Sequence, residues 1–188
     1  MTPQHYPIEP GALFGGEYPG DRNPGLAKAR IRNLVKIGVR TFIDLTTPAD
    51  QMASYEVLLE DIGSETGVAL RRISMPINDM GVPESDEIMR AIMEAIRNSL
   101  DSTPAVYIHC WGGIGRAGTV AGCWLRERGL DPDSALARVQ HLYSTHMPKV
   151  RIYPESPQTP AQKNLIRRWR PESDIPSAGC PTCRGRSL

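Results

Sequence analysis

The stretch that decides the expected fold is Val106-Tyr-Ile-His-Cys-Trp-Gly-Gly-Ile-Gly-Arg-Ala-Gly-Thr119. Its first residues form a short, continuous apolar run, which is typical of a buried central strand in a parallel sheet. The run ends at His109 and Cys110, and five residues later Arg116 begins a helical pattern. A cysteine, a fixed cation and small residues at a strand-to-helix turn favour a site for an oxyanion, above all phosphate.

The residue types in this turn suit nucleophilic chemistry on a phosphate. A helix N-terminus and an arginine both favour the thiolate form of Cys110, which is the nucleophilic form. Glycines allow backbone N–H groups to converge on phosphate oxygens, and the planar guanidinium of Arg116 can bind two of those oxygens. We expect His109 to fix the loop by hydrogen bonding rather than to act as a base. The alternative is a buried cysteine in an ordinary turn. The predicted phosphate loop comprises His109, Trp111, Gly112, Gly113, Ile114, Gly115 and Arg116.

The rest of the chain alternates strand and helix patterns on both sides of this turn. Alternation of this kind predicts an α/β fold with a central, mostly parallel sheet flanked by helices on both faces. We expect a single domain over residues 1–170 and a flexible tail over residues 171–188. Residues 1–10 are expected to be extended, 51–63 weakly helical and 144–158 irregular. Strands are predicted at 12–14, 39–45, 68–75 and 104–109, and helices at 24–37, 85–100, 116–128, 131–143 and after Thr159.

The composition excludes several classes of protein. The 188 residues are 40% apolar with a formal net charge of +1, which indicates neither disorder nor a nucleic-acid partner. No apolar run is long enough for a membrane span, and the first residues lack the pattern of a signal peptide. The four cysteines form no disulfide framework, which favours a reducing compartment, and we expect a cytoplasmic protein that is a monomer. Cys180 and Cys183 have zinc-knuckle spacing but no second pair, and we expect no metal and no cofactor.

His109-Cys-Trp-Gly-Gly-Ile-Gly-Arg116 resembles the phosphate loop of the cysteine-dependent protein tyrosine phosphatase superfamily. Its Gly-Gly form is most similar to the compact dual-specificity branch, and within it to kinase-associated phosphatases and their bacterial relatives. Gly16-Glu-Tyr-Pro-Gly20, Pro76-Ile-Asn-Asp79 and Ser156-Pro-Gln-Thr-Pro-Ala-Gln162 also fit, so the resemblance covers about residues 6–170. It implies a protein tyrosine phosphatase-like fold and hydrolysis of phosphomonoesters through a cysteinyl-phosphate.

A phosphoryl group that leaves an oxygen needs a proton on that oxygen. Asp79 lies 31 residues before Cys110 in a proline-bounded loop that follows a predicted strand. The resemblance places the general acid in such a loop, so we expect Asp79 to be the proton donor rather than a turn-capping residue. Glu84 and Asp86 fit the first turn of a helix, and Asp44 lies within a strand pattern, where we interpret it as structural.

The second chemical step, hydrolysis of the cysteinyl-phosphate, needs an oriented water molecule. Gln158-Thr-Pro-Ala-Gln162 resembles the glutamine loop that positions this water in other members of the superfamily. The resemblance therefore implies that Gln158 positions the water and that Gln162 assists. From the residues alone, the segment is only a polar loop that leads into a helix.

Ala117 departs from the pattern of the superfamily. Most members carry a serine or threonine directly after the arginine, and its hydroxyl donates a hydrogen bond to the cysteine sulfur. Phosphatases of the regenerating-liver type share an alanine there and resemble slow enzymes. We therefore hypothesise that hydrolysis of the phosphocysteine limits turnover. Thr119 stands two residues further along the helix and is not expected to substitute for the missing hydroxyl.

Three functions remain open at the level of sequence. The first is a protein tyrosine or dual-specificity phosphatase whose substrate is phosphorylated protein, phosphotyrosine in particular. Phosphoprotein is favoured over inositol lipid because the loop lacks the lysines typical of phosphoinositide phosphatases. The second is a phosphoprotein-binding module with low turnover, which Ala117 favours. The third is a cysteine enzyme of the sulfurtransferase or arsenate-reductase type. Asp79 and Gln158 favour the first, because sulfur transfer needs no proton-donating carboxyl group.

Overall fold

The computed structural model describes residues 5–172, in which one five-stranded sheet separates two layers of helices. The strand order is β1-β2-β5-β3-β4, and within this sheet β1 alone runs antiparallel to its neighbour. Strand β5 lies at the centre, and all five of its residues are buried. The strands are β1 (His5–Glu9), β2 (Leu13–Gly16), β3 (Val39–Asp44), β4 (Arg71–Ser74) and β5 (Ala105–His109).

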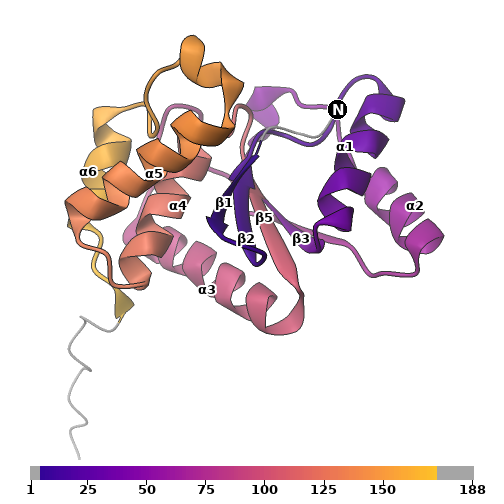
Figure 1. Ribbon diagram of the computed structural model, residues 1–188, viewed down its shortest axis with the longest axis horizontal. Coiled ribbons are helices and arrows are strands. Elements are labelled where there is room, and N and C mark those ends of the chain that lie inside the picture. Colours follow the sequence, from indigo (N-terminus) through magenta and orange to yellow (C-terminus); the bar gives the residue numbers. More distant parts are fainter. Residues whose placement is uncertain (1–4, 173–188) are drawn as a thin grey trace, which may run out of the picture.

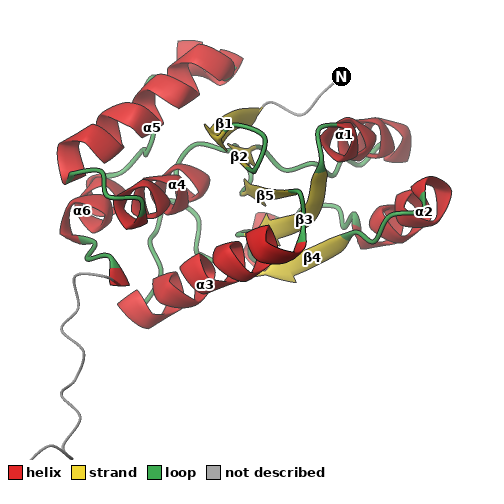
Figure 2. Ribbon diagram, turned by 60° about the horizontal axis from the view of Figure 1, so that its bottom comes forward, coloured by secondary structure: helices red, strands yellow, loops and turns green. Residues whose placement is uncertain are grey.

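Helices cover both faces of this sheet, as the sequence predicts. Figures 1 and 2 show α1 and α2 together on one face, and α3, α4, α5 and α6 on the other. Each face has its own apolar core: Ile31, Phe42 and Leu59 belong to the smaller one, and Ile108 and Val120 to the larger one. The helices are α1 (Pro24–Lys36), α2 (Glu56–Thr66), α3 (Asp86–Ser102), α4 (Arg116–Glu127), α5 (Pro132–His146) and α6 (Pro160–Arg168), with two short 3₁₀ turns, η1 (Pro48–Asp50) and η2 (Pro148–Arg151).

The sheet register places the ends of the parallel strands at a common edge. His109 at the end of β5 pairs with Gly16 of β2 on one side and with Asp44 of β3 on the other. Asp44 in turn pairs with Ser74 of β4. The loops that follow these strands therefore converge beside Cys110, where ligands bind in open α/β sheets.

Three local expectations differ from the structure, and one of them is the stretch 144–158, expected to be irregular, which contains the end of α5 and the 3₁₀ turn η2. The first residues form a strand rather than only an extended segment, because Tyr6 and Ile8 alternate toward the larger core while the backbone pairs with β2. Helix α2 begins at Glu56, several residues later than the weak helical pattern suggests. The single domain over residues 1–170 stays a prediction, and residues 173–188, with Cys180 and Cys183, lie outside the described residues.

Candidate active site

The phosphate loop is a close-packed turn between β5 and α4. Cys110 follows β5 directly and is 3% exposed. Gly113 has a φ of +72°, and a Cβ there would lie 2.4 Å from the carbonyl carbon of Gly16. Only glycine fits that position, because its backbone is left-handed and touches the backbone after β2. Helix α4 begins at Arg116 with Gly115 as its N-cap, so no side chain occupies the N–H groups of its first turn.

The guanidinium of Arg116 is held by a residue that the sequence analysis did not identify. Asp50, at the end of η1, accepts one hydrogen bond from Nη1 at 2.9 Å and one from Nη2 at 2.8 Å. Nη1 also donates to the carbonyl oxygens of Ile77 (3.1 Å) and Leu45 (3.4 Å). None of the hydrogen bonds that Arg116 makes within residues 5–172 uses Nε. Protein groups thus bind the edge of the guanidinium formed by Nη1 and Nη2, and the edge that carries Nε remains for a ligand.

Burial and hydrogen bonding act in opposite directions on this pair. Burial alone would raise the pKa of Asp50, but hydrogen bonds from Arg116 and from the Thr47 N–H outweigh it and hold the pKa below its usual value. Burial likewise disfavours the charged guanidinium, yet Asp50 and the nearby Cys110 raise the pKa of Arg116 above its ordinary value. Both groups are therefore charged at neutral pH.

Asp79 lies in the loop between β4 and α3, as the sequence predicts. Its side chain is 51% exposed, and Oδ1 lies 2.9 Å from Nη2 of Arg116. The residue after it, Met80, has a φ of +58°, an unusual conformation for a residue with a side chain. This turn directs Asp79 toward the phosphate loop, and it is closed by a hydrogen bond of 3.0 Å from the Gly81 N–H to the Asn78 carbonyl.

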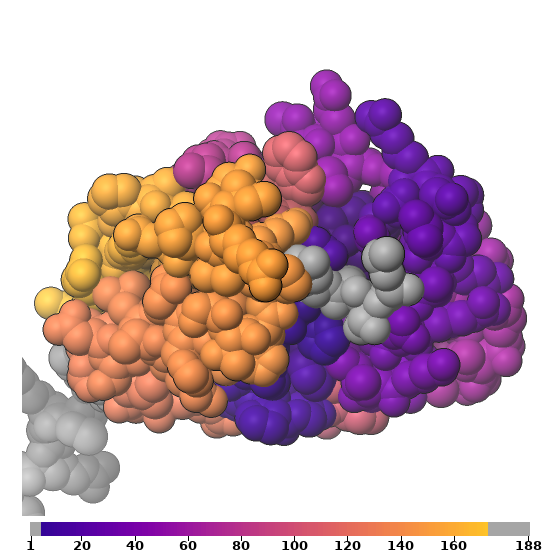
Figure 3. All heavy atoms as spheres, turned by 45° about the horizontal axis from the view of Figure 1, so that its top comes forward, coloured from indigo at the N-terminus to yellow at the C-terminus, as the bar shows by residue number. Residues whose placement is uncertain are grey.

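Most of the predicted site residues surround one cavity of about 410 Å³, which we call the Cys110 cavity. Segments near residues 80, 110 and 150 adjoin along the upper part of the view in Figure 3, and residues of all three segments line the cavity. Its rim carries four large side chains that are at least 49% exposed: Met80, Trp111, Ile152 and Tyr153. The polar lining consists of Asp79, Cys110, Arg116, Lys149 and Gln158, and the backbone of Gly112, Ile114 and Gly115 completes the wall.

The two glutamines of the predicted glutamine loop occupy different places. Gln158 lines the Cys110 cavity, whereas Gln162 is 0% exposed. Oε1 of Gln162 accepts the N–H groups of Gln158 and Thr159, each at 3.1 Å, and Nε2 donates to the carbonyl oxygen of Gly81 at 3.0 Å. Gln162 therefore joins the loop that carries Gln158 to the loop that carries Asp79.

His109 is fully buried and anchors the start of the phosphate loop. Its Nε2 is 2.7 Å from the hydroxyl of Tyr55, and its Nδ1, 3.7 Å from Asp44, has no hydrogen-bond partner within residues 5–172. Burial lowers the pKa of His109 to about 4, so the ring is neutral at neutral pH. Asp44 accepts hydrogen bonds from Arg72 (2.8 Å) and Thr46 (2.6 Å). It lies deep in the sheet edge and does not line the Cys110 cavity.

The position after Arg116 offers no hydroxyl to the sulfur. Ala117 is completely buried. The hydroxyl of Thr119 donates to the carbonyl oxygen of Gly115 at 2.8 Å, within its own helix. Thr119 is therefore occupied by the backbone of α4, as expected from its place along the helix.

Two residues that adjoin the site, Asp50 and Lys149, were not predicted from the sequence. Asp50 lies 66 positions from Arg116, and a Thr-Pro-Ala-Asp turn carries no signal beyond helix capping. Lys149 brings a cation to the phosphate loop from η2: its Nζ lies 4.0 Å from where a Cβ on Gly112 would stand. Among the described residues no cluster of histidine, cysteine, aspartate and glutamate is arranged to hold a metal ion, and no helix is long and apolar enough to cross a bilayer.

A parallel-sheet edge with a cysteine, an arginine and an uncapped helix start fits the cysteine-dependent phosphatases, and comparison with known proteins agrees. Residues 7–173 match the family described as "Swiss Army Knife protein, DSP-PTPase phosphatase domain", and the chain belongs to this family. Among solved structures, it is similar to kinase associated phosphatase with its catalytic-site cysteine replaced by serine (TM-score 0.65, 21% identity, 88% of this chain and 93% of that chain). It is also similar to the active form of Tk-PTP (TM-score 0.63, 24% identity, 88% and 95%).

Two viral proteins are among the relatives that this chain resembles in sequence. The chain is 28% identical over 166 residues to "Putative tyrosine phosphatase 067L" of Invertebrate iridescent virus 3, which covers 84% of this chain and 61% of the viral protein. It is 29% identical over 161 residues to "Putative tyrosine phosphatase 197R" of Invertebrate iridescent virus 6, covering 82% of this chain and 49% of that protein. The chain thus spans only part of the length of these relatives.

Proposed function

We propose that this protein is a cysteine-dependent phosphatase that hydrolyses phosphotyrosine on protein substrates through a cysteinyl-phosphate. One observation carries the proposal: Cys110, Arg116, Asp79 and Gln158 line a single cavity whose rim is apolar. A nucleophile, a fixed cation, a carboxyl group and an amide are the parts that two-step phosphoryl transfer requires. The proposal includes a cytoplasmic monomer that needs no cofactor.

In the first step, the thiolate of Cys110 attacks phosphorus while the bond to the leaving oxygen breaks. Arg116, through Nε and Nη2, and the N–H groups of the loop stabilise the charge on the three equatorial oxygens. Phosphate oxygens compete with Asp79 for Nη2, so substrate binding releases Asp79 from its ion pair. Asp79, protonated, then gives its proton to the leaving tyrosine oxygen.

In the second step, water attacks phosphorus and the sulfur–phosphorus bond breaks. Gln158 orients the water, Asp79 takes its proton, and Cys110 returns to the thiolate. A hydroxyl donor at position 117 would stabilise the departing sulfur, and Ala117 provides none. We propose that this step limits turnover.

The rim of the Cys110 cavity supports an aromatic leaving group. Met80, Trp111, Ile152 and Tyr153 give apolar surface against which a phenyl ring packs better than the short chain of phosphoserine. Lys149 also lines the cavity but is paired with Glu17 at 2.8 Å, so the substrate panel includes inositol phosphates to test whether it contributes to binding a second negative charge.

The test compares wild type, Cys110→Ser and Asp79→Ala on p-nitrophenyl phosphate and on phosphotyrosine and phosphoserine peptides, with EDTA present. We expect Cys110→Ser to be inactive. Asp79→Ala should lose about 10²–10⁴-fold on the peptide but much less on p-nitrophenyl phosphate, whose leaving group needs little protonation. Full activity in Cys110→Ser, or a requirement for added metal, would contradict the proposal.

A second function, phosphoprotein binding with little turnover, is favoured by Ala117. The same variants separate it from the first function. A binding module would retain phosphopeptide in the wild type as tightly as in Cys110→Ser, without releasing phosphate at a measurable steady-state rate.

A further inference from the structure

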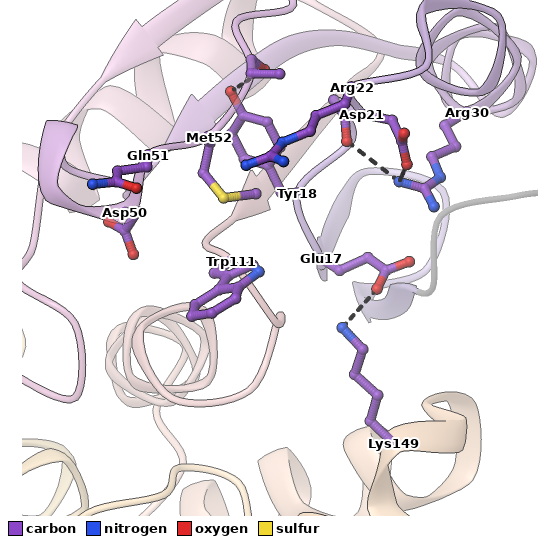
Figure 4. A pocket seen from close by; sticks show the side chains of 12 residues that line it. Glu17, Tyr18, Asp21, Arg22, Arg30, Asp50, Gln51, Met52, Trp111 and Lys149 are labelled. Atoms are coloured by element: carbon purple, nitrogen blue, oxygen red, sulfur yellow. Dashed lines mark hydrogen bonds and ion pairs between the residues drawn. The ribbon is translucent and has the colours of Figure 1, made fainter.

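A second cavity lies beside the Cys110 cavity. It has a volume of about 470 Å³, and we call it the Arg22 cavity. Trp111 and Lys149 line both cavities, so one substrate molecule can reach from one to the other. In Figure 4, Trp111 lies below Met52, and the pair formed by Glu17 and Lys149 lies to its right. The remaining lining residues come mainly from the loop after β2 and from the segment around η1: Tyr18, Gly20, Asp21, Arg22, Arg30, Asp50, Gln51 and Ala53.

The walls of the Arg22 cavity are joined by specific contacts. The N–H of Tyr18 donates to the carbonyl oxygen of Trp111 at 3.0 Å. The hydroxyl of Tyr18 donates to the carbonyl oxygen of Ala53 at 3.1 Å. A Cβ on Gly20 would lie 2.8 Å from the Ala53 carbonyl oxygen, so the loop after β2 touches the η1 segment closely. These contacts hold three segments that are distant in sequence in a defined arrangement.

The charges that line the cavity leave one cation without a counterion. Lys149 pairs with Glu17 at 2.8 Å, and Arg30 pairs with Asp21 at 3.3 Å, both drawn in Figure 4. Asp50 is paired with Arg116, which belongs to the Cys110 cavity.

Within residues 5–172, Arg22 makes no ion pair, and in Figure 4 its side chain extends toward Tyr18 and Met52. Each carboxylate that lines the cavity therefore belongs to an ion pair, and the guanidinium of Arg22 is the lining cation that has none within residues 5–172.

We propose that the Arg22 cavity binds an acidic group, a carboxylate or a second phosphate, on the same peptide whose phosphotyrosine enters the Cys110 cavity. This inference rests on the proposed function. A planar guanidinium binds carboxylate or phosphate through two parallel hydrogen bonds, which gives specificity as well as affinity. Because Trp111 and Lys149 form the boundary, the peptide crosses the indole between the two cavities.

The experiment measures kcat/KM on a phosphotyrosine peptide with alanine flanks and on a series with one glutamate or one phosphoserine at each neighbouring position. We expect an acidic residue at one or more of these positions to raise kcat/KM about tenfold through a lower KM, because its contact with Arg22 is charge-assisted. Arg22→Ala should abolish that gain, Arg22→Lys should keep part of it, and the gain should shrink at high salt. The control is Arg167→Ala, which removes another exposed arginine, one that belongs to α6 and pairs with Asp133 at 3.8 Å.

Two readouts keep this inference separate from the proposed function. Arg22→Ala should leave kcat/KM for p-nitrophenyl phosphate within about twofold of wild type, since this substrate is too small to span both cavities. Affinity for the same peptides, measured in Cys110→Ser, reports the Arg22 contact even if turnover fails. The inference is overturned if no acidic position helps in either assay, if Arg22→Ala weakens neutral and acidic peptides equally, or if only inositol phosphates depend on Arg22.

Discussion

The ion pair between Asp50 and Arg116 should set both the stability and the catalytic competence of this protein. The side chains are 2% and 1% exposed, and the contact is bidentate at 2.8 and 2.9 Å. The informative change is Asp50→Asn, which keeps the shape of the side chain and removes its charge. The new amide also turns an N–H₂ group toward one of the guanidinium N–H₂ groups.

The expected loss of stability follows from burial. Removing one partner of a buried ion pair costs about 3–5 kcal/mol, because the remaining charge stays desolvated. Asp79 and the carbonyl oxygens of Ile77 and Leu45 still face Arg116, so we expect the lower end of that range. For a chain of this size, about 3 kcal/mol corresponds to a Tm lower by about 6–12 °C.

The expected loss of activity follows from orientation. Without Asp50, the guanidinium can rotate toward Asp79, and its Nε edge no longer faces the phosphate loop. Displacement of a catalytic group by about 1 Å costs about 100-fold in rate, so kcat/KM on p-nitrophenyl phosphate should fall by roughly that factor. The inhibition constant of orthovanadate should rise in parallel.

The assays are thermal unfolding and steady-state kinetics, with Asp133→Asn as the control. Asp133 is 90% exposed and pairs with Arg167 at 3.8 Å, so its loss should change the Tm by less than about 2 °C. Two results together would contradict this prediction. The Tm of Asp50→Asn would lie within 2 °C of wild type, which corresponds to less than about 1 kcal/mol. Its kcat/KM would lie within about twofold of wild type, well short of the expected 100-fold loss.

Three further predictions follow. Ala117→Ser should raise steady-state turnover and diminish the burst of p-nitrophenol; unchanged burst and turnover would exclude slow hydrolysis of the phosphocysteine. Gln162→Glu keeps the acceptor for the N–H groups of Gln158 and Thr159 but loses the donor to the carbonyl oxygen of Gly81. The kcat on phosphotyrosine peptide should therefore fall more than the kcat on p-nitrophenyl phosphate, and equal losses would argue against a link between Gln162 and the Asp79 loop. Burial gives His109 a lower pKa in the folded protein (about 4) than in the unfolded chain (6.5). The corresponding contribution to the free energy of unfolding is therefore fully present above about pH 6.5, and about 3 kcal/mol of it is lost as the pH falls to 4. Urea unfolding at several pH values should show this slope, and His109→Asn should flatten it.

Much of the fold could be predicted from local patterns. The apolar run before His109 predicts a central strand, and β5 is central and fully buried. Helices predicted from residues 24, 85 and 116 begin at Pro24, Asp86 and Arg116 in the structure. Strand β1 was not identified because His5-Tyr-Pro-Ile-Glu9 contains a proline, and only an edge strand tolerates it.

The sequence by itself determined the chemical groups of the site, whereas the tertiary structure decided how they are used. Cys110, Arg116 and the glycines of the loop lie within a few residues of one another, so their relation follows from local geometry. Asp50 and Lys149 act across long separations in sequence, and no pattern in the chain links them to the phosphate loop.

The division has a physical reason. Strand ends converge only once the sheet register is set, and the register depends on the packing of both cores. Which carboxylate faces Arg116 and which cation remains unpaired beside Trp111 are consequences of that packing. The stretch from Val106 to Thr119 predicts an oxyanion site; the loops that the sheet brings to it decide how Arg116 is held and which further side chains line the adjoining cavities.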